Sequence, residues 1–348
     1  MRKEAVMVYT LGLAKHANIR YRDSLNRLHR CELISMLHAL SADCEVTVES
    51  LGGADFLTFE CRSLSVRELT WLSSHSSVAF VAERINGLLR PLEFSDNKYL
   101  DEDLPEILKY KGKTSAVFTR MMINIALSLS PFLFSASPLT LLDPVCGKGT
   151  ACFCALQSGM NAIGIDSDRK AVREAADYFR KYLQYHLLKH SVRTFSETSG
   201  SDSIPVQEFI FADSREHFRD NNTRFLRLSS GDTALCYALC RRSAAHLLVA
   251  DLPYGIQHAP QFGHRPESFS ALLSRVLPAW KKALLPNGVA AVSFNTLTFP
   301  TEQVISIVRS SGFTPVEGGV FGSLRHEVEQ AVVRDVVFMI NKPLEGGT

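Results

Sequence analysis

Four consecutive apolar stretches of the sequence each end on an aspartate, namely Asp143, Asp166, Asp213 and Asp251. One aspartate after a strand is ordinary, because its side chain caps the helix that follows. Four in order are hard to explain by capping alone. In a doubly wound sheet the carboxyl ends of the strands line one crevice, where ligands bind. We therefore expect the four carboxylates to share a binding crevice.

The first of these aspartates opens a tight turn, LLDPVCGKGT, over residues 141–150. A buried strand passes there through a proline and two glycines into a helix. Gly147 and Gly149 leave room for a ligand near the backbone, and the amides of the next turn point toward that ligand. Cys146 lies inside the turn, where its neighbours indicate a binding loop rather than a nucleophilic thiolate.

The positions of the aspartates suit a nucleoside that carries no phosphate. Asp166 lies roughly twenty residues beyond the glycine turn, where an acidic side chain meets ribose hydroxyls. Asp213 is placed to accept from an adenine amino group, and Asp143 to hold an ammonium group. A dinucleotide would bring its phosphates to Asp143, which repels them, and Cys152 stands where a third glycine is expected. S-adenosylmethionine fits this pattern better.

The stretch DLPYG, residues 251–255, resembles the D/N-P-P-Y/F signature of enzymes that methylate amino groups conjugated to a ring or carbonyl, and this resemblance implies the chemistry beside that cofactor. An amino nitrogen conjugated to a ring is a poor nucleophile, and acceptors that hold its hydrogens direct its lone pair toward a methyl donor. Asp251 and the backbone carbonyl of Leu252 are the expected acceptors. Pro253 holds Leu252 extended, and Tyr254 offers a ring on which an extruded base stacks. Such catalysis depends on positioning and charge acceptance, and it needs no metal.

DPVCGKGT, GIDSD, ADS and DLPYG, in this order and spacing, resemble the motifs of class I S-adenosylmethionine-dependent methyltransferases. More narrowly, the chain resembles the RNA guanine-N2 methyltransferases, a group that often carries a THUMP domain. The resemblance covers roughly residues 109–342 and implies a Rossmann-like α/β fold. The resemblance also implies a cofactor site, formed by motif residues and by residues next to them: Phe118, Thr119, Asp143, Cys146, Gly147, Gly149, Asp166, Asp213 and Ser214.

The resemblance implies methyl transfer to the amino group of guanine in structured RNA, with tRNA as the first choice. A small activator protein is a further partner that stays open. Leu252 departs from the proline that is commoner in the D/N-P-P-Y/F signature, although the acting group there is its carbonyl. A DNA adenine-amino methyltransferase shares the motif order and is the nearest alternative. An RNA-binding protein with a decayed methyltransferase fold is the second, and a protein-glutamine methyltransferase fits less well because that group has asparagine at position 251.

The composition is that of a globular chain: 348 residues, 46% hydrophobic and 21% charged, with a net charge of +2. This length predicts two domains. The small net charge neither indicates nor excludes a nucleic-acid-binding surface. Eight cysteines without metal-ligand or disulfide spacing favour a cytoplasmic protein. The apolar stretch 125–142 is interrupted by serines and prolines, so no membrane span is expected. A basic cluster that serves either as a solvated face or as a nucleic-acid contact comprises Arg20, Arg22, Arg27, His29 and Arg30.

The order of strand-like and helix-like stretches predicts how these residues are positioned. Residues 1–90 form a small α+β domain that presents RNA, residues 91–110 a linker, and residues 111–348 the methyltransferase domain. Residues 191–203 are rich in serine and threonine and predict a mobile loop, and the arginines of the irregular stretch 214–242 are expected to line the entrance. The predicted α/β sheet, covered on both faces and ending in an antiparallel hairpin, has strands 139–143, 161–166, 206–213, 244–251, 289–294, 313–321 and 332–340.

Overall fold

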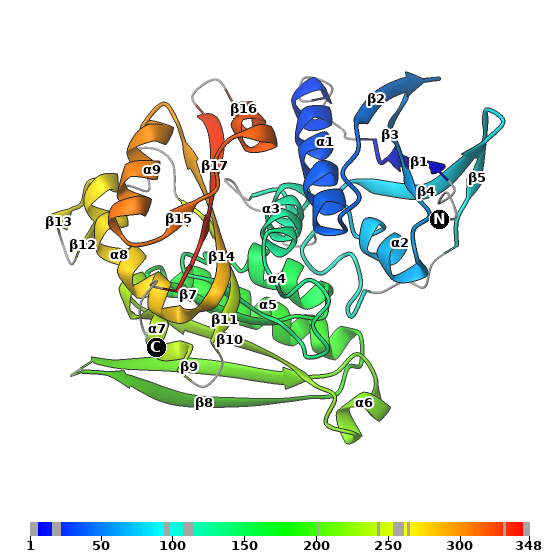
Figure 1. Ribbon diagram of the computed structural model, residues 1–348. Helices are drawn as coiled ribbons and strands as arrows, with labels where there is room; N and C mark the ends of the chain where they lie inside the picture. Colours follow the sequence, from blue (N-terminus) through cyan, green and yellow to red (C-terminus); the bar gives the residue numbers. More distant parts are fainter. Residues whose placement is uncertain are drawn as a thin grey trace.

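The structure, a computed structural model, contains two main β-sheets with helices packed against them (Figure 1), and a short two-stranded sheet that pairs residues 261–262 with 265–266. The smaller sheet comes from the N-terminal part of the chain and the larger sheet from the remainder. None of the helices in the described part of the chain has the length and apolar character that a bilayer crossing needs. The residues that the structure describes are 6–15, 22–93, 98–106, 114–200, 202–241, 244–252, 261–262, 265–329 and 332–343.

The N-terminal unit consists of β1 (Val6–Leu13), α1 (Arg22–Ala39), β2 (Val46–Leu51), β3 (Ala54–Arg62), α2 (Val66–Leu72), β4 (Val78–Ile85) and β5 (Leu88–Pro91). Its sheet is antiparallel, with strand order β2-β3-β1-β4-β5. Gly52 and Gly53 make the two-residue turn between β2 and β3, with φ of 59° and 79°. A type I′ turn requires positive φ at both positions, which glycine adopts without strain.

The larger unit begins with α3 (Ala116–Ser128), β6 (Thr140–Asp143), α4 (Thr150–Gln157), β7 (Asn161–Asp166), α5 (Arg169–Tyr185), β8 (His190–Ser199), β9 (Asp202–Phe211), α6 (Arg215–Arg219) and β10 (Arg224–Ser230). It continues with α7 (Cys236–Leu239), β11 (Ala245–Asp251), β12 (Gln261–Phe262), β13 (Arg265–Pro266), α8 (Phe269–Ala283), β14 (Leu284–Asn295), α9 (Thr301–Ser310), β15 (Thr314–Pro315), β16 (His326–Glu329) and β17 (Val332–Ile340). The strand order of the large sheet is β15-β17-β14-β11-β6-β7-β10-β9-β8, with β16 paired to β17.

Five neighbouring strands of the large sheet, β10-β7-β6-β11-β14, are parallel. Their spatial order in terms of the chain is 3-2-1-4-5, which is the order of a doubly wound α/β fold. An antiparallel β17 follows β14 at one edge. The predicted fold class, a Rossmann-like α/β sheet with a terminal antiparallel hairpin and a small α+β unit before it, is confirmed.

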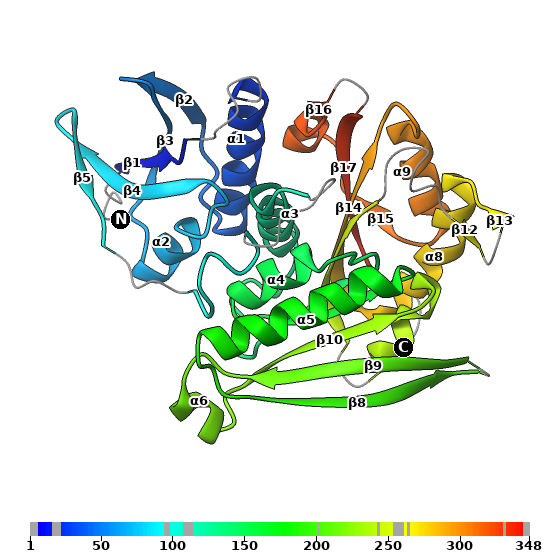
Figure 2. The ribbon, with the colours of Figure 1, turned by 180° about the vertical axis from the view of Figure 1, so that it is seen from behind.

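Helices cover both faces of the large sheet (Figure 2). α3, α4 and α5 pack on one face, and α8 and α9 pack on the other. Adjacent strand residues such as Leu141 and Leu142 belong to opposite cores, because side chains alternate between the faces of a strand. The core beneath α3 is continuous with the core of the N-terminal unit, so α1 packs directly on α3.

Two sequence expectations about the sheet are wrong. Residues 191–203 are not a loop, because β8 pairs along its whole length with β9, and Arg193 binds Glu208 across the strands at 2.6 Å. Most of the strand is exposed and Phe195 is only partly buried, so it carries little apolar pattern that the sequence could show. The strand expected at 313–321 shrinks to the short β15, because the glycines at 318 and 319 take positive φ there and a 3-10 turn follows.

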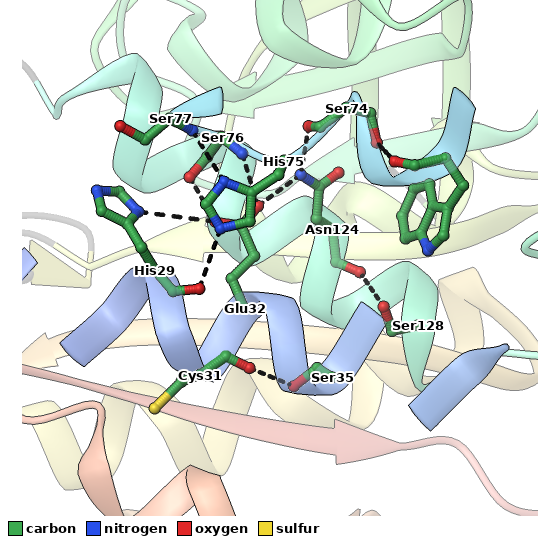
Figure 3. A network of polar contacts seen from close by, with 11 residues as sticks. His29, Cys31, Glu32, Ser35, Ser74, His75, Ser76, Ser77, Asn124 and Ser128 are labelled. Carbon is green, nitrogen blue, oxygen red and sulfur yellow. Dashed lines mark hydrogen bonds and ion pairs between the residues drawn. The ribbon is translucent and has the colours of Figure 1, made fainter. Parts of the chain in front are cut away.

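A buried polar network joins the N-terminal unit to α3 (Figure 3). The carboxylate of Glu32, on α1, is fully buried and accepts hydrogen bonds from the Ser76 amide at 2.8 Å and the Asn124 side chain at 2.7 Å. Ser76 lies between α2 and β4, and Asn124 lies on α3. Burial alone would raise the pKa of Glu32, but the facing His75 and His29 and the Asn124 donor outweigh it and lower the pKa to about 2. Glu32 therefore holds three elements together as a charged acceptor.

The same cluster offers three metal-type ligand atoms, from His29, Glu32 and His75, within 4.8 Å of one another. The Ser77 amide donates to Nδ1 of His75, so the ring proton lies on Nε2 and faces the carbonyl of His29 at 3.0 Å. Glu32 and His75 thus link α1 to the segment before β4, and we call the cluster the structural junction.

The first prediction concerns this junction. Glu32→Gln should lower the free energy of unfolding by about 1–3 kcal/mol, because the amide group brings a donor to face the Ser76 and Asn124 donors. Since the folded pKa is depressed, the contribution of Glu32 is complete above about pH 4.3 and is lost as the pH falls toward about 2. Chemical denaturation at several pH values measures both effects. The exposed Glu45→Gln is the control, and equal unfolding midpoints for the two variants would contradict the prediction.

Candidate active site

The crevice lies where the winding of the large sheet reverses, between β6 and β11. Ligands bind outside the carboxyl ends of the strands at such a point. Asp143 is the last residue of β6 and Asp251 is the last residue of β11, so an aspartate lies on each side of the point between these two strands. The neighbouring β7 ends on Asp166. The structure thus brings three of the four predicted aspartates together.

The glycine turn after β6 is tied to the end of β7. The Gly147 amide donates to the Asp166 carboxylate at 2.7 Å, and the Cys146 amide donates to the carbonyl of Ile165 at 3.1 Å. Gly147 has φ of 48°, and no atom lies within 4 Å of where its side chain would start. The turn therefore keeps an open space beside its backbone, as a ligand-binding loop requires.

The other small residues of the region serve packing. A side chain on Gly149 would start 3.1 Å from the ring of Phe153, and one on Gly164 would start 3.0 Å from the sulfurs of Cys146 and Cys152. Burial raises the pKa of both thiols well above its ordinary value, so they stay protonated. Cys146 is consequently a packing residue in the turn and lacks the thiolate of a nucleophile.

The three acids share a strongly negative environment. Asp143 is 5% exposed, and its burial, together with the charges of Asp166 and Asp251, raises its pKa well above the ordinary value. Burial also raises the pKa of Asp166, although the amides of Asp168 and Gly147 oppose the shift. A crevice of this kind repels phosphate and favours a ligand that carries positive charge.

Asp251 is oriented by hydroxyl groups. Ser293, on β14, and Thr114 both donate to its carboxylate, and the Arg334 guanidinium lies 3.8 Å away. The amide of the buried Leu252 donates to the carbonyl of Ser293 at 3.0 Å, which fixes the chain beyond β11. These partners were not predicted from the sequence, although a serine inside the apolar stretch VAAVSF was a usable signal. The predicted residues Pro253 and Tyr254 lie outside the described residues.

Phe118 and Thr119 lie in the first turn of α3. The Phe118 ring packs against Arg334, whose guanidinium carbon is 4.6 Å from the ring centre, and against His326 at 5.2 Å. The Thr119 hydroxyl donates to the carbonyl of Ser115 at 3.0 Å. The structure therefore places Phe118 beside Asp251, through Arg334, and Thr119 inside the helix.

Asp213 lies at the opposite edge of the sheet. β9 runs antiparallel to β10, and its end at Phe211 pairs with the start of β10 at Arg224. Asp213 binds His217 at 2.5 Å, and Ser214 caps α6. The expectation that Asp213 and Ser214 share the crevice is wrong, because the β8-β9 hairpin puts an extra antiparallel strand before the third parallel one.

Asp232 is the acid that takes the corresponding place after β10. The Gly231 amide donates to the backbone carbonyl of Asp166 at 2.9 Å, so this loop adjoins the end of β7. The Asp232 carboxylate binds Arg275 at 2.8 Å and caps the short turn that follows. The stretch LRLSSGD, with its alternating pattern and closing Gly-Asp, was the signal for β10.

Three arginines of residues 214–242, which were expected to line the entrance, lie elsewhere in the described structure. Arg224 donates at 2.5 Å to a backbone carbonyl just before β7, at the far edge of the sheet. Arg227 is 9% exposed and binds Glu208 at 2.6 Å. Arg219 belongs to α6, on the same side as Asp213. The basic residues near Asp251 come instead from α1 and from the β16-β17 region.

The sequence matches no protein-family model, and no curated protein matches it. Solved structures with a similar arrangement include TrmN from Thermus thermophilus, at 15% identity over 85% of this chain and 59% of that one, with a TM-score of 0.38. A second is the T. thermophilus 16S rRNA N2 G1207 methyltransferase RsmC with AdoMet and guanosine, at 11% identity, 86% and 58% coverage, and a TM-score of 0.36. A third is a TehB-like SAM-dependent methyltransferase from Corynebacterium glutamicum, at 14% identity, 62% and 85% coverage, and a TM-score of 0.34. This chain spans less than two thirds of TrmN and RsmC, and the fold assignment rests on its own strand order.

The second prediction tests the placement of Asp213. Asp213→Ala should leave the affinity for S-adenosylmethionine within about twofold, since the side chain lies at the far edge, whereas Asp166→Ala should weaken it by at least about tenfold through loss of a charged acceptor. Isothermal titration calorimetry measures both variants, with circular dichroism as the check of folding. Equal losses for the two variants would refute the placement.

The third prediction follows from the raised pKa of Asp143. A cationic ligand favours the ionised carboxylate of Asp143, so binding of the ligand should release protons. The affinity for S-adenosylmethionine should fall by up to about tenfold per pH unit below the pKa that Asp143 has in the ligand-free protein. This loss of affinity should begin at a pH above the range in which an ordinary aspartate titrates. Calorimetry of S-adenosylmethionine binding in buffers of different ionisation enthalpy counts the protons. Asp143→Asn should bind more weakly and release fewer, and a wild-type affinity that stays constant from pH 8 to about pH 5 would contradict the prediction.

Proposed function

We propose that this chain transfers a methyl group from S-adenosylmethionine to the exocyclic amino group of guanine in structured RNA, with tRNA as the first substrate to test. The observation that carries the proposal is the convergence of Asp143, Asp166 and Asp251 on the open turn at Gly147. An α/β crevice with this charge suits a nucleoside that bears cations in place of phosphates.

The residues present fit that cofactor. S-adenosylmethionine supplies an activated methyl group on a sulfonium and carries an ammonium group as well. Asp143 offers a buried carboxylate for a positive group. The Asp166 carboxylate accepts the amides of Gly147 and Asp168, and a carboxylate, with about four lone-pair sites, can accept ribose hydroxyls as well. Gly147 leaves the space through which the ligand reaches the backbone.

Asp251 is the proposed acceptor for the substrate amino group. Its carboxylate is held by Ser293 and Thr114, so it faces the crevice in one orientation. An amino hydrogen bonded to this carboxylate leaves the nitrogen lone pair directed at the methyl group. As the new N–C bond forms and the C–S bond breaks, the nitrogen becomes positive, and Asp251 stabilises that charge and accepts the proton. The Leu252 carbonyl, Pro253 and Tyr254 keep the roles that the DLPYG resemblance implies.

The choice of guanine in RNA rests on the resemblance of DPVCGKGT and DLPYG to the guanine-N2 group. A nucleic-acid substrate is also supported by two exposed basic residues beside the β16-β17 pair, where Arg27 on α1 donates to the carbonyl of Arg325. This strand pair lies on the side of β11 away from β6 and its glycine turn.

The fourth prediction is that Asp251→Ala lowers kcat by at least about 100-fold while the affinity for S-adenosylmethionine changes little, since one acceptor of the developing charge is lost. The assay supplies methyl-labelled S-adenosylmethionine to total small RNA, genomic DNA and protein extract, and chromatography of the digests identifies the product. Asp220→Ala, exposed on the far side, is the control. Methyladenine in DNA as the labelled product would replace the proposed reaction with its nearest rival, and full turnover by Asp251→Ala would remove Asp251 from it.

A further inference from the structure

A small apolar pocket lies beside Asp251, on the side away from the glycine turn. It has a volume of about 140 Å³, and its walls come from α1, the start of α3, and the β16-β17 pair. Arg334 of β17 lines it and lies 3.8 Å from the Asp251 carboxylate. Because Arg334 pairs with Asn295 at the carboxyl end of β14, the pocket opens at the same edge as the crevice.

The lining is suited to a flat, largely apolar ring. Leu25 and Leu28 of α1 face Phe118 and Met121 of α3, with Val328 of β16 on a third side. The volume is well below that of pockets for drug-sized ligands, which hold about 300–1,000 Å³, so there is room for one ring system and not for a whole cofactor. Among the described residues, none that lines the pocket is acidic.

The rim of the pocket is basic. The exposed Arg27, which lies in the chain between the lining residues Leu25 and Leu28, donates to the carbonyl of Arg325, and the exposed Arg325 precedes the lining residue His326. His326 and Arg334 lie within the lining itself. Positive charge at the rim of an apolar pocket complements a nucleotide unit, whose base is apolar on its faces and whose phosphates are anionic.

We propose that α1 of the N-terminal unit completes the acceptor site: the pocket takes one unstacked base of the RNA strand, and Arg27 and Arg325 hold the flanking phosphates. This inference rests on the proposed function and adds the element that recognises the acceptor. It explains why α1 is fastened to α3 through Glu32, since a loose α1 would open one wall of the pocket. It also identifies an RNA contact made without the arginines of residues 214–242.

The test, and the fifth prediction, uses the full chain and two kinds of variant. Val328→Trp fills the pocket, and its control is Val66→Trp, where the side chain is 75% exposed. Arg27→Glu reverses a rim charge, and its control is Arg219→Glu, at the far edge of the sheet. The probe is an RNA hairpin with 2-aminopurine in its loop, whose emission rises when the ring leaves the stack. Methyl transfer to total small RNA and S-adenosylmethionine affinity are measured in parallel.

Wild-type protein should raise the probe emission, and Val328→Trp should abolish the rise while S-adenosylmethionine affinity stays within about twofold. Arg27→Glu should raise the KM for RNA by at least about tenfold and flatten its dependence on salt, because fewer phosphates are neutralised. Both controls should match wild type. Probe binding or RNA KM values that are the same in wild type, Val328→Trp and Arg27→Glu overturn the pocket assignment. Probe binding that depends on the pocket, without any methyl transfer to RNA, overturns the proposed function and leaves the pocket as an RNA site.

Discussion

The site depends on one hydrogen bond, from the Gly147 amide to the Asp166 carboxylate. It closes the glycine turn against the end of β7 and holds the turn in the left-handed conformation that leaves its outer side open. It also places Asp166 close enough to Asp143 for their charges to interact. Two acids that repel each other are thereby kept together in a buried place. Such an arrangement lowers stability unless a cation is present, so the negative crevice is shaped for a ligand.

The second constraint is the fastening of the N-terminal unit. Its core runs without a break into the core beneath α3, and at their boundary Glu32 is surrounded by donors from two other segments. A buried carboxylate needs every one of these donors, because an uncompensated charge in an apolar interior is costly. This requirement sets the position of α1 on α3. The same helix then provides one wall of the pocket beside Asp251.

These two constraints give the two sides of Asp251 different electrostatic character. The glycine turn, Asp143 and Asp166 form the side where positive charge is favoured. The side of α1, β16 and β17 is apolar with a basic rim. The proposed reaction needs a cationic methyl donor on one side and an anionic strand with a flat base on the other. The electrostatic asymmetry of the crevice matches that division.

Much of the fold could be predicted because strands and helices leave periodic apolar patterns. β7 and β17 have the predicted bounds, and the doubly wound sheet follows from the alternation of strands and helices. β8 could not be predicted in this way, since an edge strand held by cross-strand pairs such as Arg193 and Glu208 buries little apolar surface. Without β8 in the predicted fold, β9 is taken for the third parallel strand, whereas in the structure it is antiparallel to β10. The position of Asp213 was therefore predicted at the wrong edge.

The sequence by itself determined the type of sheet, the glycine turn and the acids at the ends of β6, β7 and β11, because those features are local and each lies within one strand-turn-helix unit. Only the tertiary structure decided which strand is the third parallel one, which hydroxyls orient Asp251, and that α1 reaches the site. These are contacts between segments far apart in the chain, as between Thr114 and Asp251 or between Arg27 and Arg325. No local pattern encodes them, since they depend on how complete elements pack.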